Sequence, residues 1–327
     1  MTTATDGVSY APGILDRDAT FYVAGHRGLV GSAIVRRLDA AGFTNIVGKT
    51  SAELDLKNRD DVFEYLGEIR PRYLVLAAAK VGGILANSTY PVDFLSDNLR
   101  IQSNVLDAAL ANDVERVAFL GSSCIYPKFA EQPIREDSLL TGRLEPTNDA
   151  YAIAKIAGIM NIQAVRRQYG LPWISAMPTN LYGPNDNFSP KGSHVLPALI
   201  RRYDEAVRSG ASSVTNWGSG TPRREFLHSD DMADAVLHLL EHYDGPEQVN
   251  VGTGTDVTIR EVADTIARVV GFEGETEWDT SKPDGTPQKL LDVSKLTDAG
   301  WTSKIPLEEG LERTVTWYRE HAGAIRV

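Results

Sequence analysis

The sequence predicts an α/β fold, with a doubly wound parallel sheet followed by a smaller, interleaved α/β lobe towards the C-terminus. Two observations predict the sheet. Short apolar runs of β-forming residues alternate with stretches of helical periodicity from residue 20 to about residue 180, which is typical of repeated βαβ units. The first of these runs leads directly into a glycine-rich turn and a helix, as a dinucleotide-binding loop does.

Composition and charge exclude several classes of protein. The chain has 327 residues, of which 42% are hydrophobic, so it can bury one large core or two interlocked ones. Its 33 basic and 44 acidic residues give a net charge of −11, which argues against nucleic acid or an anionic membrane as the main partner. The single cysteine, Cys124, excludes an intrachain disulfide framework. No apolar run approaches the roughly 18 residues of a membrane span and no secretion signal is evident, so we expect a cytoplasmic protein.

The first expected unit consists of a buried strand over residues 20–24, a glycine turn and a helix. The turn places Gly25, Gly28 and Gly31 at the spacing G-x-x-G-x-x-G. Glycine lets the backbone approach a pyrophosphate closely, and the N-terminus of the following helix stabilises the negative charge. Because a second strand follows, this unit predicts a Rossmann domain that binds a nicotinamide dinucleotide.

The end of the second expected strand, residues 45–47, distinguishes the two nicotinamide dinucleotides. An Asp or Glu at this point would bind the ribose hydroxyls, but the chain continues Gly-Lys-Thr-Ser without an acid. Lys49 and Arg27 are both available for a 2′-phosphate, so NADP(H) is the favoured cofactor. Lysine offers a point charge rather than a fork, so we expect a modest preference. Glu53 lies close in the sequence and keeps NAD as the alternative.

The alternation continues to about residue 180 and then breaks. Helices are expected over residues 58–69 and 91–111, and strands over residues 73–79, 117–120 and 173–177. A long loop rich in Pro, Gly and Asn then leads into a helix near His194, and a strand over residues 248–251 follows later. No linker separates the two parts. The expected boundaries are a loose N-terminal extension without periodic pattern (1–18), a Rossmann domain (19–180, with 225–253 returning to it) and a substrate-binding lobe (181–224 and 254–327).

Three residues form a candidate proton-transfer group. Tyr151 and Lys155 are spaced i, i+4 on an expected helix and therefore share one face. A free tyrosine has a pKa of about 10, and a cationic neighbour lowers it. Ser122, at the end of an expected strand, can orient the substrate oxygen or the phenol. Together they suit a carbonyl/alcohol pair, the chemistry of a nicotinamide-dependent reductase, although Y-x-x-x-K is also a common surface pattern.

Other reactive residues admit two interpretations. Cys124 follows Ser122 by two residues and is a candidate base, because a thiolate serves as one when its pKa approaches neutrality. The alternative interpretation is that Cys124 is a small hydrophobic residue buried in the core. His238 and His242 share a helix face, but no third ligand accompanies them, so we expect no metal site.

Several sequence blocks together resemble the GDP-L-fucose synthase branch of the extended short-chain dehydrogenase/reductase family. They are GHRGLVG, AAAKVGG, GSSCIYP, EPTNDAYAIAKIAG, MPTNLYGPNDNF, SHVLPALIRR, WGSGTPRREFLHSDDMA and KPDGTP. The resemblance runs from about residue 20 to near the C-terminus. Y-x-x-x-K marks only the superfamily, whereas SSCIYP, PTNLYGPNDNF and the blocks from SHV to GTPRREF are specific to this branch.

The resemblance implies an NADPH-dependent 3,5-epimerase/4-reductase that acts on GDP-4-keto-6-deoxy-D-mannose, as a homodimer packed through helices. In the family's mechanism Cys124 corresponds to the base and His194 to the acid of epimerisation. Tyr151 then protonates the C4 oxygen as hydride is delivered to C4. Lys155 lowers the tyrosine pKa and holds the nicotinamide ribose, and Ser122 positions the keto oxygen.

The resemblance also implies two sets of binding residues. The cofactor set is Gly25, Arg27, Gly28, Leu29, Val30, Gly31, Lys49, Asp55, Leu56, Lys155, Pro178, Asn180, Leu181 and His194. The GDP-sugar set is Arg202, Trp217, Arg224 and Asp284. Arginine suits a diphosphate through its bidentate fork, and the tryptophan is able to pack on the ligand. The alternative to a binding role for Arg202 is that it belongs to a basic surface of a helix.

Three other functions stay open at this point. One is a related enzyme that acts on another GDP-4-keto sugar, such as a heptose. A 4-epimerase that holds NAD tightly is disfavoured, because it would leave Cys124 and His194 without a task. A non-catalytic NADP-binding regulator is disfavoured because Ser122, Tyr151 and Lys155 are all present.

Overall fold

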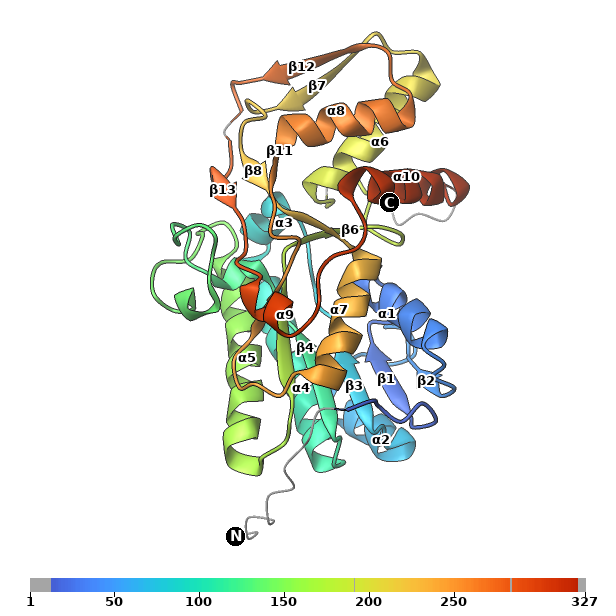
Figure 1. The fold of residues 1–327 in the computed structure, drawn as a ribbon, viewed down its shortest axis with the longest axis vertical. Helices are drawn as coiled ribbons and strands as arrows, with labels where there is room; N and C mark the ends of the chain where they lie inside the picture. Colours follow the sequence, from blue (N-terminus) through green and yellow to red (C-terminus); the bar gives the residue numbers. More distant parts are fainter. Residues whose placement is uncertain (1–12, 191, 283, 323–327) are drawn as a thin grey trace.

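The structure, a computed structural model, describes residues 13–190, 192–282 and 284–322. It consists of a six-stranded parallel sheet with helices on both faces and of a smaller α/β lobe beyond the carboxyl ends of the strands (Figure 1). The α/β class and the doubly wound sheet predicted from the sequence are therefore confirmed.

The central sheet has the order β10-β5-β4-β3-β1-β2, and every neighbouring pair is parallel. Its strands are β1 (Phe21–Ala24), β2 (Ile46–Val47), β3 (Tyr73–Leu76), β4 (Arg116–Leu120), β5 (Ile174–Pro178) and β10 (Val249–Val251). The chain moves outward from β1 to β2 and then crosses to β3 on the other side of β1. This reversal is a topological switch point, where doubly wound sheets bind ligands at the strands' carboxyl ends.

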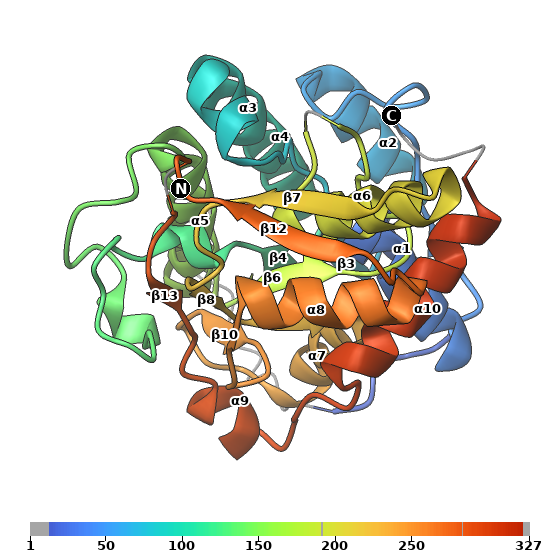
Figure 2. The same cartoon turned by 90° about the horizontal axis from the view of Figure 1, so that it is seen from above.

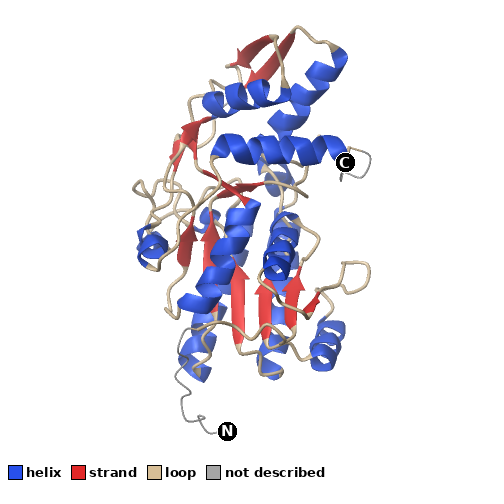
Figure 3. Cartoon of the chain, turned by 45° about the vertical axis from the view of Figure 1, so that its right-hand side comes forward, coloured by secondary structure: helices blue, strands red, loops and turns tan. Residues whose placement is uncertain are grey.

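Helices cover the two faces of the sheet (Figure 3). One face carries α2 (Arg59–Ile69), α4 (Pro91–Ala111) and α5 (Asp149–Tyr169), and the other carries α1 (Leu29–Ala40) and α7 (Ser229–His242). Side chains of β1 alternate between two apolar cores. Phe21 and Val23 pack in the core with α1 and α7, whereas Tyr22 and Ala24 pack in the core on the other face. A strand buried on both sides has to be apolar throughout, as predicted for residues 20–24.

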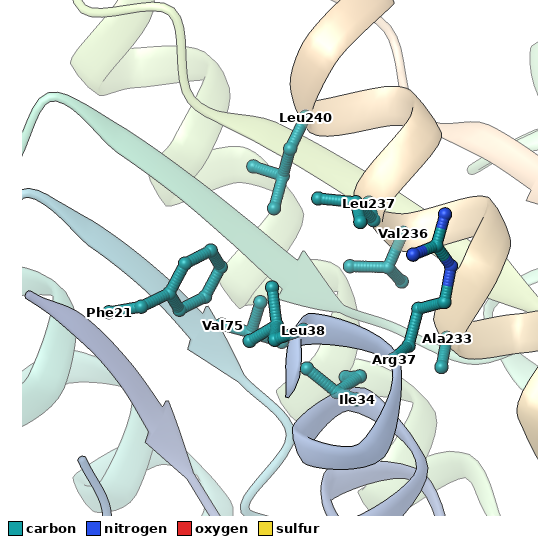
Figure 4. A pocket seen from close by; sticks show the side chains of 9 residues that line it. All are labelled: Phe21, Ile34, Arg37, Leu38, Val75, Ala233, Val236, Leu237 and Leu240. Atoms are coloured by element: carbon teal, nitrogen blue, oxygen red, sulfur yellow. The ribbon is translucent and has the colours of Figure 1, made fainter. Parts of the chain in front are cut away.

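The gap between α1 and α7 is part of this packing and not a ligand site. Apolar side chains from both helices and from β1 and β3 line it, and Arg37 stands at its edge (Figure 4). The gap has no room for a water molecule. Arg37 pairs with Asp234 at 2.7 Å and so links the two helices across the rim.

The smaller lobe is built from short strands and three helices. Its strands are β7 (Ser213–Trp217), β12 (Glu275–Asp279), β8 (Arg223–Arg224), β11 (Val257–Thr258) and β13 (Gln288–Lys289), and its helices are α6 (Val195–Ser209), α8 (Ile259–Val270) and α10 (Leu307–Glu320). Seen from above, the parallel pair β7 and β12 lies beside α8 (Figure 2). A separate apolar core fills the lobe, with Tyr203, Ile200 and Ile266 fully buried.

Short elements connect the lobe to the sheet. The strands β6 (Asn180–Tyr182) and β9 (Phe226–His228) pair with each other between the two parts. The remaining short helices are α3 (Ile84–Thr89), η1 (Ser123–Ile125), η2 (Glu136–Ser138) and α9 (Ser294–Asp298). Near the end of the chain, Leu296 and Trp301 pack into the core of the sheet. This stretch was expected in the substrate lobe, but it packs against the Rossmann domain, whose core buries its apolar side chains.

The expected N-terminal extension falls mostly on residues 1–12, outside the described residues. Its remaining part is anchored, which corrects the expectation of a loose segment. Leu15 is buried in the core of the sheet, and Arg17 pairs with Glu241 at 2.7 Å. Within the described part of the chain, no helix is both long and apolar enough to cross a membrane.

Candidate active site

The glycine turn after β1 forms a cradle that only glycine permits. Gly25 has a φ of +86°, and a Cβ added to it would lie 2.8 Å from the backbone of Ala78. A Cβ on Gly31 would lie 2.1 Å from the carbonyl oxygen of Gly25. Gly28 begins α1 without a side-chain cap, so the first N–H groups of the helix are available to an anion. Leu29 and Val30 continue the first turn of α1, so the turn fits the pyrophosphate of a dinucleotide.

Two cations lie near the end of β2. Lys49 and Arg27 are both exposed there, and the positive charges of both act on Glu53. The Glu53 carboxylate accepts hydrogen bonds from the Thr50 N–H at 2.8 Å and from the Thr50 hydroxyl at 2.7 Å, and these bonds lower its pKa. Glu53 is thus engaged with its own turn. The arrangement suits a 2′-phosphate better than a free ribose hydroxyl.

The other expected cofactor residues lie along the same edge. Asp55 is exposed and Leu56 is half-buried in the segment after β2. Pro178 ends β5, and Asn180 and Leu181 begin the next short strand, β6. The Asn180 amide donates to a backbone carbonyl of residue 225 at 2.8 Å, which fixes this crossover between the two parts of the protein.

Ser122, Tyr151 and Lys155 come together where β4 ends and α5 begins. The Ser122 side chain lies close enough to the Tyr151 phenol to lower its pKa through hydrogen bonding. Lys155 is buried one turn further along α5, with its Nζ 5.9 Å from the centroid of the Tyr151 ring. Its ammonium donates to the Leu120 carbonyl at 2.8 Å. The predicted grouping of these three residues is therefore present.

The expected effect of Lys155 on the tyrosine is not found. Burial raises the pKa of Tyr151, the negative charge of the Cys124 thiolate raises it further, and the bond to Ser122 only partly offsets this. Burial also lowers the pKa of Lys155 to about 8, and its ammonium is directed to a carbonyl group of β4. The phenol therefore keeps its proton near neutral pH, as a proton donor to a forming alkoxide must.

The Cys124 thiol has two polar partners. The Asn148 amide Nδ2 donates to Cys124 Sγ at 3.3 Å, and the Lys289 ammonium donates to it at 3.7 Å. Cys124 lies in η1, Asn148 directly precedes α5, and Lys289 comes from β13 of the smaller lobe. The two donors come from different parts of the chain and fix the position of the sulfur between the sheet domain and the smaller lobe.

His194 lies within range of the Lys289 charge. It directly precedes α6, and part of its side chain is open to solvent. Burial of the rest lowers its pKa, and the positive charge of Lys289 lowers it further. Lys289 therefore contacts Cys124 and its charge also acts on His194.

The four expected GDP-sugar residues all lie in the smaller lobe. Arg202 on α6 donates to Asn216 Oδ1 at 2.7 Å, next to Trp217, whose side chain is 71% exposed. Asp284 accepts from the Ser219 N–H at 2.9 Å.

Arg224 lies beside this group. A Cβ added to Gly285 would lie 3.1 Å from Arg224 Nη2, so the guanidinium adjoins the Asp284 loop. Burial lowers the pKa of Arg224. A guanidinium, an exposed indole and a carboxylate side by side suit a nucleoside diphosphate.

The chain is similar to proteins of a known family. The profile of the NAD dependent epimerase/dehydratase family matches residues 21–252. A protein of Oryza sativa subsp. japonica described as "Probable GDP-L-fucose synthase 1" is 60% identical over 322 residues, 98% of this chain and 98% of that relative. The chain belongs to the GDP-L-fucose synthase family.

Further members support this assignment. GDP-L-fucose synthase of Escherichia coli (strain K12) is 54% identical over 314 residues, 93% of this chain and 98% of the relative. The crystal structure of a GDP-L-fucose synthetase from Naegleria fowleri bound to NADP superimposes with a TM-score of 0.90, at 31% identity, over 100% of both chains.

Sequence reasoning missed two residues of the site in this family member. Lys289 lies 165 residues from Cys124 in the chain, in a block that had been noted only for KPDGTP. Asn148 lies inside the block that carries Tyr151, and nothing in that block marked it as a partner of Cys124. Among the described residues, no group of three or more His, Cys, Asp or Glu is placed to hold a metal ion.

Proposed function

We propose that this chain converts GDP-4-keto-6-deoxy-D-mannose to GDP-L-fucose, by epimerisation at C3 and C5 followed by NADPH-dependent reduction at C4. One observation carries the proposal: a Ser–Tyr–Lys group for reduction and a Cys–Lys–His group for epimerisation lie together at the carboxyl edge of one sheet. Membership of the GDP-L-fucose synthase family supports the same reaction.

Epimerisation is assigned to the cysteine and the histidine. The C4 keto group acidifies the protons on C3 and C5, so one group has to remove a proton and another has to return one to the opposite face. Cys124, held by Lys289, removes the proton and becomes a thiol. His194, whose low pKa makes its protonated form a stronger acid, returns a proton from the other side.

Reduction is assigned to the serine, tyrosine and lysine. NADPH, when bound, supplies the hydride that reduces C4. Tyr151 gives its phenolic proton to the C4 oxygen, which Ser122 orients through its hydroxyl. Lys155 holds the nicotinamide ribose. The raised pKa of Tyr151 supports its role as a donor in this direction.

The cofactor and the GDP-sugar are assigned to different parts of the chain. The turn after β1, the cations near β2 and the edge from Pro178 to Leu181 hold NADP(H), with His194 at the border. Arg202, Trp217, Arg224 and Asp284 hold the GDP-sugar in the lobe formed by residues 181–224 and 254–327, of which the stretch with Leu296 and Trp301 packs on the Rossmann domain. Residues 19–180 and 225–253 together make up the Rossmann domain.

A homodimer in the cytoplasm completes the proposal. Val92 on α4 and Ile153 and Tyr169 on α5 are exposed apolar side chains on one face of the sheet domain, and a second copy packed on these helices would cover them. The reaction needs a free thiol at Cys124, which a reducing compartment preserves.

Cofactor absorbance tests this function directly. Purified protein is mixed with GDP-4-keto-6-deoxy-D-mannose and either NADPH or NADH, and the product is identified by chromatography against GDP-L-fucose. Rapid oxidation of NADPH with GDP-L-fucose as the product supports the proposal. Binding of NADPH without oxidation contradicts it, and turnover of a GDP-4-keto-heptose alone would replace it with the related function.

A further inference from the structure

Asn148 occupies a helix-capping position without capping the helix. Asparagine is among the best residues at this position, where its side-chain oxygen normally accepts an N–H bond from the first turn. Asn148 makes no such bond to α5. Its amide nitrogen instead donates to Cys124 Sγ at 3.3 Å, and its carbonyl oxygen Oδ1 is buried without a partner.

Neighbouring contacts hold Asn148 in this orientation. Its backbone N–H donates to the Glu145 carbonyl at 3.1 Å, which closes a turn before α5. The Glu145 carboxylate pairs with Lys128 at 2.9 Å and also accepts from Thr147 at 3.3 Å. The turn is thus fixed from two sides. A capping bond has been given up for a bond to the thiol, and a buried acceptor is left unsatisfied, which is a pattern of functional sites.

We propose that Asn148 has two roles in the epimerisation half of the reaction: its amide N–H positions and stabilises the Cys124 thiolate, and its carbonyl oxygen accepts a hydroxyl of the bound sugar. This inference rests on the function proposed for Cys124. Asn148 gives up no proton itself. It keeps the sulfur charged until the thiolate takes a proton from the sugar, and its free acceptor is satisfied only when substrate is present.

Alkylation of the thiol tests the first role without any substrate. Cys124 is the chain's single cysteine, so the rate of iodoacetamide modification as a function of pH reports on this sulfur alone. Asn148→Asp places a carboxylate beside the sulfur, and we expect the midpoint of the profile to rise by about one pH unit or more. Asn148→Ala removes the donor and should give a smaller rise. Asn112→Asp, which alters an amide bonded to the Ala108 carbonyl at the far end of α4, is the matched control and should leave the midpoint unchanged.

Steady-state kinetics test the second role. Asn148→Asp keeps an acceptor, so the KM for the keto-sugar should stay within about threefold, whereas Asn148→Ala should raise it about tenfold. Both variants should slow solvent-deuterium incorporation into the sugar more than they slow NADP⁺-dependent oxidation of GDP-L-fucose, which needs no epimerisation. An unchanged alkylation midpoint in both variants overturns the first role, and an unchanged KM in Asn148→Ala overturns the second. Failure of the wild type to turn over the keto-sugar would instead contradict the proposed function, because the alkylation profile does not depend on it.

Discussion

The Lys289 ammonium lies 3.7 Å from the Cys124 thiol, across the boundary between the smaller lobe and the sheet. The same charge also lowers the pKa of His194. A single cation from β13 therefore contacts Cys124 and acts on His194. Since β13 belongs to the smaller lobe, this contact links the lobe to the sheet domain directly at the cysteine.

Replacing Lys289 with methionine should impair epimerisation selectively. Loss of the cation removes an interaction with the thiolate, so we expect deuterium incorporation at C3 and C5 to fall by about 10- to 100-fold. Oxidation of GDP-L-fucose by NADP⁺ should fall by less than about fivefold. Lys295→Met, which breaks only the surface pair with Glu247, serves as control. Equal losses in both assays would show that Lys289 supports the lobe as a whole.

Removing the Tyr151 hydroxyl should give the opposite pattern. Tyr151→Phe keeps the ring and its edge contact with Phe94 but removes the proton donor, so hydride transfer should slow by about 10²- to 10⁴-fold. Deuterium should still enter C3 and C5 of the unreduced keto-sugar. Mass spectrometry of the recovered sugar together with NADPH absorbance separates the two steps. Loss of deuterium incorporation in this variant would mean that the two reactions share their proton donor.

Cofactor preference should depend on the cations near β2. Lys49→Ala and Arg27→Ala each remove a charge suited to a 2′-phosphate, so kcat/KM for NADPH should fall by about tenfold while that for NADH changes by less than twofold. Arg59→Ala is the matched control, since this exposed cation lies further along the chain at the start of α2 and stacks on Phe63. If NADPH and NADH respond equally, these cations do not bind the 2′-phosphate.

A buried carboxyl in the connecting loop should make stability depend on pH. Burial raises the pKa of Asp186 to about 7, and its Oδ2 has no hydrogen-bond partner. Below about pH 4 the group is neutral in both the folded and the unfolded protein. As the pH rises towards 7, the carboxyl loses its proton in the unfolded state before it does in the folded state. This favours the unfolded state, so the free energy of unfolding falls. Asp186→Asn should therefore raise the free energy of unfolding by about 2 to 4 kcal/mol at pH 8 and by much less at pH 4.

Urea unfolding of both proteins at the two pH values measures this difference. Asp18→Asn, at an exposed residue, is the control and should show no such pH dependence. A gain for Asp186→Asn that is equal at pH 4 and pH 8 would contradict the titration of Asp186.

The sheet domain was predictable because its signals are local. A continuous apolar strand and a glycine turn lie next to each other in the sequence, and they suffice to predict β1, α1 and the cradle between them. The spacing of Tyr151 and Lys155 likewise predicts a shared face. Burial is the main cause of the raised pKa of Tyr151, and burial depends on tertiary packing, so this shift was beyond sequence reasoning.

The smaller lobe was less predictable. The side chains of β7 alternate between exposed and buried, but a polar Asn216 is buried and an apolar Trp217 is exposed, so the pattern of polarity that marks a strand is weakened. The contact between Lys289 and Cys124 was also unpredictable from the sequence, because 165 residues separate the two in the chain. Neither feature has a sequence signal of its own without a relative for comparison.

One labelling experiment tests the central claim that a single site epimerises and then reduces. The wild-type protein is incubated in D₂O with GDP-4-keto-6-deoxy-D-mannose and NADPH, and the product is analysed by NMR. The account predicts GDP-L-fucose with deuterium at C3 and C5 and with the hydride of NADPH at C4. A reduced product that keeps the manno configuration and carries no deuterium at either carbon would contradict it.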